Sequence, residues 1–269
     1  MDDKRLQEIA HKVRKYVIEM TFNAGSGHPG GSLSATDVLT FLYFEEMNVD
    51  PASPDYPERD RFVLCKGHSA PALYAVLALK GFFPEEELKT LRKLGSRLQG
   101  HPERTLPGIE VGTGSLGQGL SIALGIALAA RLDKRQSRVY ALMGDGEQQE
   151  GQVWEAAMAC AHYKVSNLCA IVDKNRLQID GSTDEVMDIE PLDEKYKAFG
   201  WNVLKIDGHS FTEIRKAFNR ARECKECPTL IIANTIKGKG VSFMENSLEF
   251  HGRALTEDEL KRALNELLK

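Results

Sequence analysis

The stretch "VYALMGDGEQQEGQVWEAAMACAHYKVSNLCAIVDKN", residues 139–175, decides the fold. Its first and last parts, residues 139–143 and 168–172, are short apolar runs of the kind that form buried strands. Residues 153–162, between these runs, have the length and pattern of a helix. A strand–helix–strand unit of this length predicts two parallel strands that lie side by side.

The same alternation of strands and helices continues on both sides of this stretch. Further strands are predicted at 61–65, 201–206 and 230–235, and further helices at 5–22, 34–46, 70–80, 115–132, 196–199 and 211–222. A last helix is predicted from Thr256 to the C-terminus. This order predicts an α/β fold, with a parallel β-sheet that carries helices on both faces. We expect one domain over residues 1–269, with a helical N-terminal portion and a C-terminal tail helix.

The composition is that of an ordinary globular protein. The 269 residues are 42% hydrophobic and 28% charged, and the net charge of −4 gives no electrostatic reason to expect nucleic-acid binding. The most apolar segment, residues 120–130, is shorter than the ~20 residues that a membrane span needs. The first residues lack the apolar stretch of a signal peptide. We therefore expect a cytoplasmic protein without nucleic-acid or membrane partners.

Five cysteines are present, and only Cys224 and Cys227 form a C-x-x-C pair. A structural zinc site needs a second pair of ligands at comparable spacing, and the sequence contains none. A redox role favours the N-terminus of a helix, whereas Cys224 follows a predicted helix. The sequence therefore predicts that this pair is inert.

A carboxylate and an amide come directly after the two strands of the opening stretch. Asp145 follows the strand at 139–143, and Asn175 follows the strand at 168–172. In parallel sheets, ligands gather at the carboxyl ends of strands. Carboxylate and amide oxygens are ligands that Mg²⁺ or Ca²⁺ accepts, and Mg²⁺ often takes further oxygens from a phosphate. We therefore predict that Asp145 and Asn175 hold a divalent cation that bridges to a phosphate.

Four of the seven histidines have a glycine neighbour and no simple structural explanation. They are His28, His68, His101 and His251. A neighbouring glycine allows the backbone to bring an imidazole close to a ligand, and an imidazole can donate to hydroxyls or transfer protons. The others are explained locally: His11 and His162 fall in helical patterns, and His209 precedes a helix cap at Ser210.

The Gly-Asp-Gly at 144–146, followed by Asn175, resembles the thiamine-diphosphate motif. Together with "GSGHPGG", "DRFVLCKGHSAPALY", "LGSRLQGHPE", "GTGSLGQGL" and the closing "FHG", it resembles the N-terminal half of transketolase over nearly the whole chain. The family often shows "GHPGAP" where this chain has "GHPGGS", and a second histidine commonly precedes the one matched by His251. These departures concern substrate contacts and not the cofactor site.

The resemblance implies a role for each matched residue. The cofactor diphosphate would contact His68, Gly146, Asn175 and His251, and the aminopyrimidine would contact the backbone of Gly114, Ser115 and Leu116. The metal would be ligated by Asp145, Asn175 and the Leu177 carbonyl. The substrate oxygens would face His28, His101 and His251. Glu150 matches the family glutamate at the contact that links paired active sites.

The resemblance also implies an activity and a partner. Transketolases transfer a two-carbon ketol unit from a ketose phosphate to an aldose phosphate through a thiamine-diphosphate carbanion. The glutamate that activates the cofactor lies on a separate pyrimidine-binding domain, for which this chain has no room. We therefore expect a C-terminal partner subunit that carries this domain, in an α2β2 assembly, and a chain that is inactive alone. A longer reading frame past Lys269 is the alternative.

Other functions explain these motifs less completely. Residues 112–117 also spell G-x-G-x-x-G, but a dinucleotide-binding turn needs a full strand directly before it, and residues 107–111 hardly form one. Among thiamine enzymes, deoxyxylulose-phosphate synthase and the 2-oxo-acid dehydrogenase α-subunit are the nearest alternatives, and "LGSRLQGHPE" favours transketolase over both. A non-catalytic, cofactor-binding relative would not need the four histidines.

Overall fold

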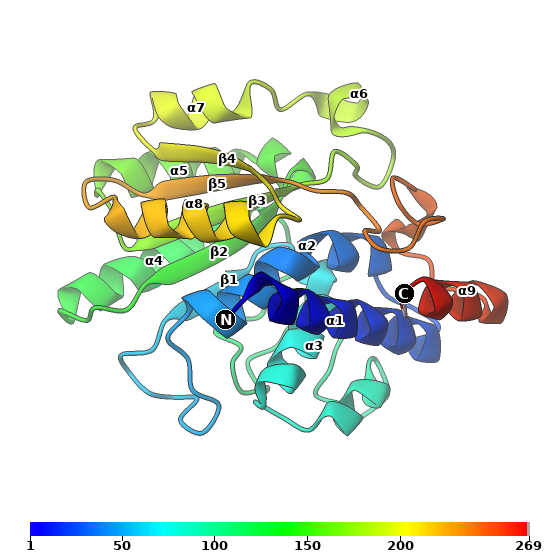
Figure 1. The fold of residues 1–269 in the computed structure, drawn as a ribbon. Helices are drawn as coiled ribbons and strands as arrows, with labels where there is room; N and C mark the ends of the chain where they lie inside the picture. The colour runs from blue at the N-terminus through cyan, green and yellow to red at the C-terminus, as the bar shows by residue number, and fades with distance from the viewer. Residues whose placement is uncertain (268–269) are drawn as a thin grey trace.

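Five parallel strands form one sheet in the order β1-β2-β3-β5-β4 in the computed structural model, which describes residues 1–267 (Figure 1). The strands are β1 Arg61–Leu64, β2 Val139–Gly144, β3 Leu168–Lys174, β4 Asn202–Asp207 and β5 Thr229–Asn234. Every pairing in the sheet is parallel. The predicted fold class and all five predicted strands are confirmed.

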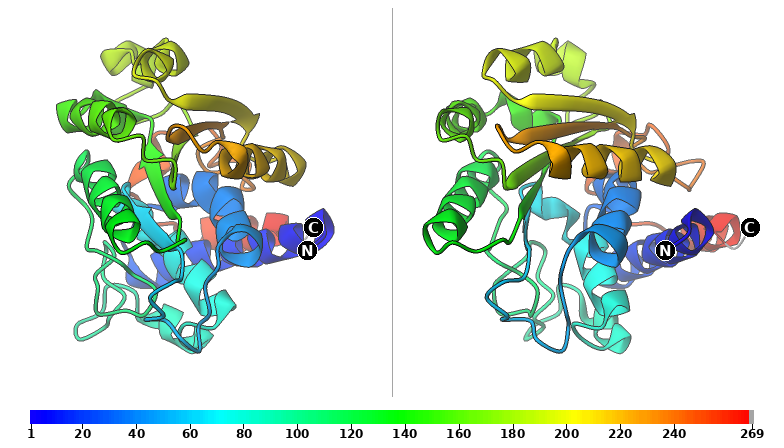
Figure 2. Two further views of the ribbon diagram at one scale, coloured as in Figure 1. Left: turned by 90° about the vertical axis from the view of Figure 1, so that its left-hand side faces the viewer. Right: turned by 60° about the vertical axis from the view of Figure 1, so that its left-hand side comes forward.

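Helices cover both faces of this sheet. The helices described in residues 1–267 are α1 Asp3–Ala24, α2 Pro29–Phe41, α3 Ala70–Lys80, α4 Gln118–Leu132, α5 Gly151–His162, α6 Thr183–Met187, α7 Leu192–Ala198, α8 Phe211–Glu223 and α9 Glu257–Leu267, of which α9 packs on α1 and not on the sheet. Alternate residues of β2 point into two cores: Tyr140 and Leu142 pack with α1, α2, α3 and α8, whereas Ala141 and Met143 pack with α4, α5 and α7. Figure 2 shows these two helical layers on opposite sides of the sheet.

Helix α2 begins earlier than the sequence pattern indicated. We expected a capping box at Ser34, but the helix starts at Pro29, with His28 as its N-cap, and its last turn at 42–46 is a π-helix. The Ser34 hydroxyl donates to the Gly31 carbonyl and to Asp173 Oδ2 at 2.6 Å, and so does not cap the helix. The prediction was wrong because Ser34 serves a tertiary contact with β3.

Two other helices start three or four residues away from the predicted position, and one helix was not predicted. Helix α4 starts at Gln118 and not at 115, because residues 115–117 form a loop that ends at Gly117 with a φ of 86°. Helix α7 starts four residues before the predicted 196, and α6 was not predicted. No helix within residues 1–267 is long and apolar enough to cross a membrane.

The predicted cap of the tail helix is confirmed. The Glu259 carboxylate accepts from the Thr256 amide at 2.8 Å, and the Thr256 hydroxyl accepts from the Glu259 amide at 3.4 Å. This helix, α9, lies beside α1, the first helix of the chain (Figure 1). The last two residues of the predicted helix, 268 and 269, lie outside the described residues.

The strand register brings the ends of the central strands to one edge. Gly144 of β2 pairs with Asp173 of β3, and Lys174 of β3 pairs with Asn234 of β5. The residues that follow β2, β3 and β5 therefore emerge side by side. This edge carries the candidate site.

Candidate active site

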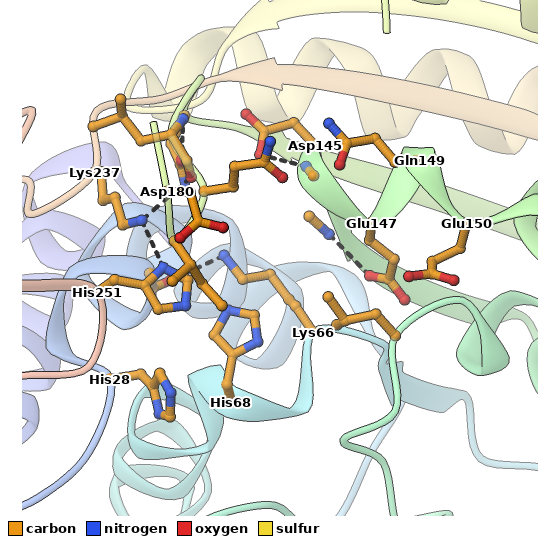
Figure 3. A pocket seen from close by; sticks show the side chains of 18 of the residues that line it. His28, Lys66, His68, Asp145, Glu147, Gln149, Glu150, Asp180, Lys237 and His251 are labelled. Carbon is orange, nitrogen blue, oxygen red and sulfur yellow. Dashed lines mark hydrogen bonds between the residues drawn. The ribbon is translucent and has the colours of Figure 1, made fainter. Parts of the chain in front are cut away.

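A cavity of about 340 Å³ lies at the carboxyl edge of the sheet (Figure 3). Its walls come from the start of α2, the turn after β1, the segments after β2, β3 and β5, and the turn at 249–251. The lining residues include His28, Gly31, Lys66, His68, Gly114, Leu116, Gly144, Asp145, Gly146, Glu147, Gln149, Glu150, Asn175, Leu177, Gln178, Asp180, Lys237 and His251. Most of the residues predicted for the site thus meet in one cavity.

The three predicted metal ligands lie in one wall of this cavity. The buried Asp145 carboxylate accepts from the amides of Gly146 at 2.8 Å and Arg176 at 2.5 Å. Asn175 donates its side-chain NH₂ to Ser34 Oγ at 3.3 Å, and its oxygen accepts from the Leu177 amide at 3.1 Å. Because an ionised carboxylate offers about four acceptor positions, two amide bonds leave Asp145 capacity for a cation.

The electrostatics of Asp145 fit a cation. Burial raises the pKa of Asp145 to about 6, and the charge of Asp173 adds to this effect. A divalent cation beside this carboxylate would favour its charged form. Within residues 1–267 no group of three or more histidine, cysteine, aspartate or glutamate side chains could hold a metal ion. A metal here would therefore bind mixed oxygens from a carboxylate, an amide and a carbonyl, which suits Mg²⁺ or Ca²⁺.

The four predicted histidines come together from four segments of the chain. The His28 ring centroid lies 5.3 Å from that of His68, 5.5 Å from that of His251 and 6.3 Å from that of His101. Burial is the main cause that lowers the pKa of His28 to about 4 and that of His251 to about 3. These imidazoles are therefore neutral near pH 7, and each can donate from one ring nitrogen and accept at the other. The buried Nδ1 of His28 has no hydrogen-bond partner among the described residues.

Two buried lysines supply the positive charge of the cavity, and the sequence analysis missed both. Lys66 donates to Asp173 Oδ2 at 2.5 Å. Lys237 Nζ lies 2.8 Å from His251 Nδ1 and 3.2 Å from the Leu177 carbonyl (Figure 3). Burial and the nearby Lys66 charge lower the pKa of Lys237 to about 8. Lys237 lies in the segment that follows β5, so the strand-end rule indicates this segment, but only the fold shows that the lysine is buried.

A buried glutamate, also missed, joins two glycine turns of the cavity. The Glu147 carboxylate accepts from the Gly117 amide at 3.0 Å and from the Gly144 amide at 3.1 Å. Burial raises the pKa of Glu147 to about 7. The turn predicted to face the aminopyrimidine and the turn predicted to face the diphosphate are thus fixed to each other by one side chain.

Glycines make room for the groups that line the cavity. A Cβ at Gly30 would stand 2.8 Å from the Phe250 carbonyl oxygen and 3.2 Å from Lys237 Cγ, and a Cβ at Gly31 would stand 3.2 Å from Ser69 Oγ and 3.4 Å from Lys66 Nζ. The "PGG" at the start of α2 therefore allows the helix to approach the basic side chains. A side chain at position 31 would therefore narrow the space in which an anion could contact Lys66.

Some predicted residues lie at the margin of the cavity. Glu150 is exposed at its rim. His101 and Ser115 line an adjoining hollow that shares Gly114 with the main cavity. The dinucleotide alternative is wrong, because residues 107–111 form no strand before the glycine turn.

The remaining histidines lie outside the cavity. His11 and His162 are exposed on helices, in keeping with the prediction that they carry no chemistry. His209 does more than the predicted turn chemistry: its Nδ1 lies 2.7 Å from Asp37 Oδ2, and its Nε2 accepts from the Ile236 amide at 2.9 Å. This residue supports the segment that carries Lys237.

Comparisons with known proteins agree with this geometry. The family model described as "Transketolase, thiamine diphosphate binding domain" matches residues 5–267. The chain is 49% identical over 265 residues to the 6-deoxy-6-sulfo-D-fructose transketolase subunit SqwG of Clostridium sp. (strain MSTE9), covering 98% of this chain and 96% of the relative. It is 46% identical over 267 residues to one subunit of the apulose-4-phosphate transketolase of Phocaeicola vulgatus, covering 99% and 95% respectively.

Solved structures give the same result. The transketolase of Campylobacter jejuni matches with a TM-score of 0.94 at 36% identity over 99% of this chain. This chain spans only 43% of that protein's chain and 42% of the human transketolase, to which it is 43% identical.

Proposed function

This chain belongs to the transketolase family, whose thiamine diphosphate-binding domain it spans, and we propose that it works as the diphosphate-binding subunit of a two-subunit ketol transferase. Two relatives that it matches over 95–96% of their lengths are described as transketolase subunits. The longer transketolases contain more than twice the matched length. These comparisons support a partner subunit, which we propose carries the pyrimidine-binding domain in a cytoplasmic α2β2 assembly.

The cofactor and its metal would bind at the carboxyl edge of the sheet. We assign the metal, Mg²⁺ or Ca²⁺, to Asp145, Asn175 and the Leu177 carbonyl, because these oxygens share one cavity wall. His68, Gly146, Asn175 and His251 would hold the diphosphate, and the buried Lys66 and Lys237 would balance its charge. Gly114, Ser115 and Leu116 would contact the aminopyrimidine. When bound, thiamine diphosphate supplies the nucleophilic carbon on which ketol transfer depends.

The histidines would bind the sugar. His28, His101 and His251 would hydrogen-bond substrate oxygens, and their neutral form at pH 7 allows each to donate from one nitrogen and accept at the other. An imidazole that shares a proton with a substrate hydroxyl contributes ~10²–10⁴-fold as a general acid or base. The substrates we propose are a ketose phosphate donor and an aldose phosphate acceptor.

The observation that carries this proposal is the single cavity that combines an oxygen-rich wall, two buried lysines and a cluster of imidazoles. A dinucleotide-binding site does not need this combination of oxygens, lysines and imidazoles. The names of the relatives include a sulfonated ketose and a ketose phosphate, so the donors to be tested should include both kinds.

The experiment is copurification with the neighbouring gene product, followed by a ketol-transfer assay with and without thiamine diphosphate and Mg²⁺. We expect transfer only when both subunits, the cofactor and the metal are present. Full transfer by this chain alone would contradict the need for a partner. Cofactor binding without transfer for any donor would contradict the catalytic role.

A further inference from the structure

A second group of reactive side chains lies at the opposite edge of the sheet from the cavity. Cys224 is the residue that ends α8, and Cys227 lies two residues before β5, so both stand at the amino edge. Their sulfur atoms are 3.3 Å apart, and Cys224 Sγ also lies 3.5 Å from the Cys227 carbonyl oxygen. Neither the cofactor site nor the proposed ketol transfer uses these residues.

These two thiols differ from the other three in accessibility. Cys224 and Cys227 are partly exposed, whereas Cys65, Cys160 and Cys169 are buried. Burial raises the pKa of Cys160 and of Cys169 to about 12, which keeps both as unreactive thiols. Partial burial also acts on Cys224, but hydrogen bonds from Cys227 and the backbone outweigh it and lower the pKa of Cys224 below its usual value.

A basic hollow of about 620 Å³ adjoins the pair. It is lined by Lys225 and Glu226, the two residues between the cysteines, and seven of its twelve lining residues are lysine or arginine. Glu226 is the only carboxylate among them. In a chain with a net charge of −4, this is a local concentration of positive charge.

Helix ends explain part of this charge but not all of it. Helices α4, α5 and α8 end nearby, and cations are favourable at helix C-termini. Arg131 serves this purpose, since it donates to the carbonyls of Tyr163 and Lys164. Arg135 and Arg222 pair with Asp133 and Glu46. By contrast, Lys134, Lys164 and Lys225 make no ion pair with any residue in 1–267, so their charges are free to attract an anion.

We propose that Cys224 and Cys227 form a redox-active dithiol that exchanges with an anionic low-molecular-weight disulfide bound in this basic hollow. The sequence alone predicted an inert pair, because Cys224 lies at the wrong end of a helix for a stable thiolate. The short distance between the sulfurs and the cations beside them change that interpretation. The cysteine pair is thus proposed as a site of reversible oxidation, and its co-substrate is an anionic small disulfide.

The exchange has two steps. The Cys224 thiolate attacks one sulfur of the small disulfide, whose S–S bond breaks, and one small thiol leaves while a mixed disulfide remains on Cys224. The Cys227 thiolate then attacks the Cys224 sulfur, a second small thiol leaves, and the Cys224–Cys227 disulfide forms. The protein loses two electrons and two protons, and the small disulfide gains both.

The test uses the reduced two-subunit assembly and glutathione disulfide as the anionic probe, with peptide mass spectrometry as the readout. We expect a Cys224–Cys227 cross-link, two glutathione molecules released per chain, and unmodified Cys65, Cys160 and Cys169. Cys227→Ser should stop the reaction at a glutathionyl group on Cys224, and Cys224→Ser should slow modification at this site strongly. Both changes are close in size to the native residue, and circular dichroism checks the fold.

Two further probes test the basic hollow. Uncharged bis(2-hydroxyethyl) disulfide and cationic cystamine should react about tenfold or more slowly than glutathione disulfide at low salt. This advantage should shrink at high salt and in Lys134→Gln/Lys164→Gln. Equal rates for the three probes would overturn the role of the hollow. Failure of the wild-type assembly to form the cross-link would overturn the dithiol proposal, whatever the result of the ketol-transfer assay.

Discussion

Asp145 combines burial with unused acceptor capacity at the end of β2. Its carboxylate accepts two backbone amides, yet burial raises its pKa to about 6, so the two amides do not fully offset the loss of water. A divalent cation would supply the missing stabilisation. The neighbouring carboxylate of Asp173 has less of this capacity, because Lys66, Ser34 and Thr235 already donate to it and the Lys66 charge already stabilises its charged form.

The change Asp145→Asn therefore tests the metal site. We expect metal-dependent binding of thiamine diphosphate to weaken by at least ~100-fold, since even indirect supports of a metal ligand are worth about 10–100-fold. Calorimetric titration of the assembly with the cofactor, with and without Mg²⁺, measures this. The control is Asp180→Asn, which removes an exposed carboxylate from the same cavity. Equal losses in both variants would contradict the assignment of Asp145.

His251 is the histidine most closely tied to the other groups of the cavity. It stacks on His68, with ring centroids 5.4 Å apart, and contacts Lys237. We expect His251→Ala to lower kcat/KM for ketol transfer by ~10²–10⁴-fold, the usual worth of a positioned acid or base. His162→Ala, on the exposed face of α5, is the matched control and should leave kcat/KM unchanged. A rate for His251→Ala within about twofold of wild type would remove it from the site.

At the scale of elements, a buried polar network joins α1, α2 and the segment after β5. Asp37 of α2 bonds to Arg14 of α1 at 2.6 Å and to His209 at 2.7 Å. His209 in turn accepts from the amide of Ile236, the residue before Lys237. The helical N-terminal portion is thus connected to the segment after β5 that carries Lys237.

The network predicts a pH-dependent contribution to stability. Burial alone would raise the pKa of Asp37, but the Arg14 charge and the His209 hydrogen bond outweigh it and hold the pKa below 3.8. The stabilisation is therefore complete above pH 3.8 and is lost as the pH falls through the lower pKa of the folded state.

We expect Asp37→Asn to lower the free energy of unfolding by about 3–5 kcal/mol at pH 7, because it leaves the Arg14 charge buried and unpaired. The difference in the free energy of unfolding between the variant and wild type should become smaller below pH 3.8. Urea titrations of both proteins at several pH values measure it, with the exposed Asp55→Asn as control. A constant difference across this pH range would show that the charge of Asp37 is not the cause.

The sequence predicted strands better than it predicted the contacts between elements. The strands β2 and β3 could be predicted because both faces of each strand are buried, which gives each strand a continuous apolar run in the sequence. Ser34 misled the prediction because its partner, Asp173, is 139 positions away. Lys66 and Lys237 were missed because a lysine is usually a surface residue, and only the folded chain shows that both are buried.

Some residues of the site could be predicted from the sequence, and others could not. Asp145 and Asn175 could be predicted because a general rule places ligands at strand ends. The grouping of His28, His68 and His251 rested on glycine neighbours and on the family resemblance. No local pattern shows that Glu147 bonds to Gly117, because the two residues meet only when the sheet has formed.

For the whole molecule, cofactor and metal binding should stabilise the assembly. A ligand at 100 times its Kd adds about 2.7 kcal/mol to the free energy of unfolding. We therefore expect thiamine diphosphate with Mg²⁺ to raise Tm by several degrees, and a chelator to reverse the rise. Differential scanning calorimetry measures it. If thiamine diphosphate raised Tm by the same amount in the presence of a chelator, this would contradict a diphosphate that binds through a metal.

The most direct test of the account is the position of the metal. A crystal of the two-subunit assembly grown with thiamine diphosphate and Mn²⁺, which replaces Mg²⁺ and scatters anomalously, locates the ion without reference to its surroundings. We predict one anomalous peak per chain within about 2–2.3 Å of oxygens of Asp145, Asn175 and the Leu177 carbonyl. A peak elsewhere, with Asp145 and Asn175 bound to no ion, would contradict the account.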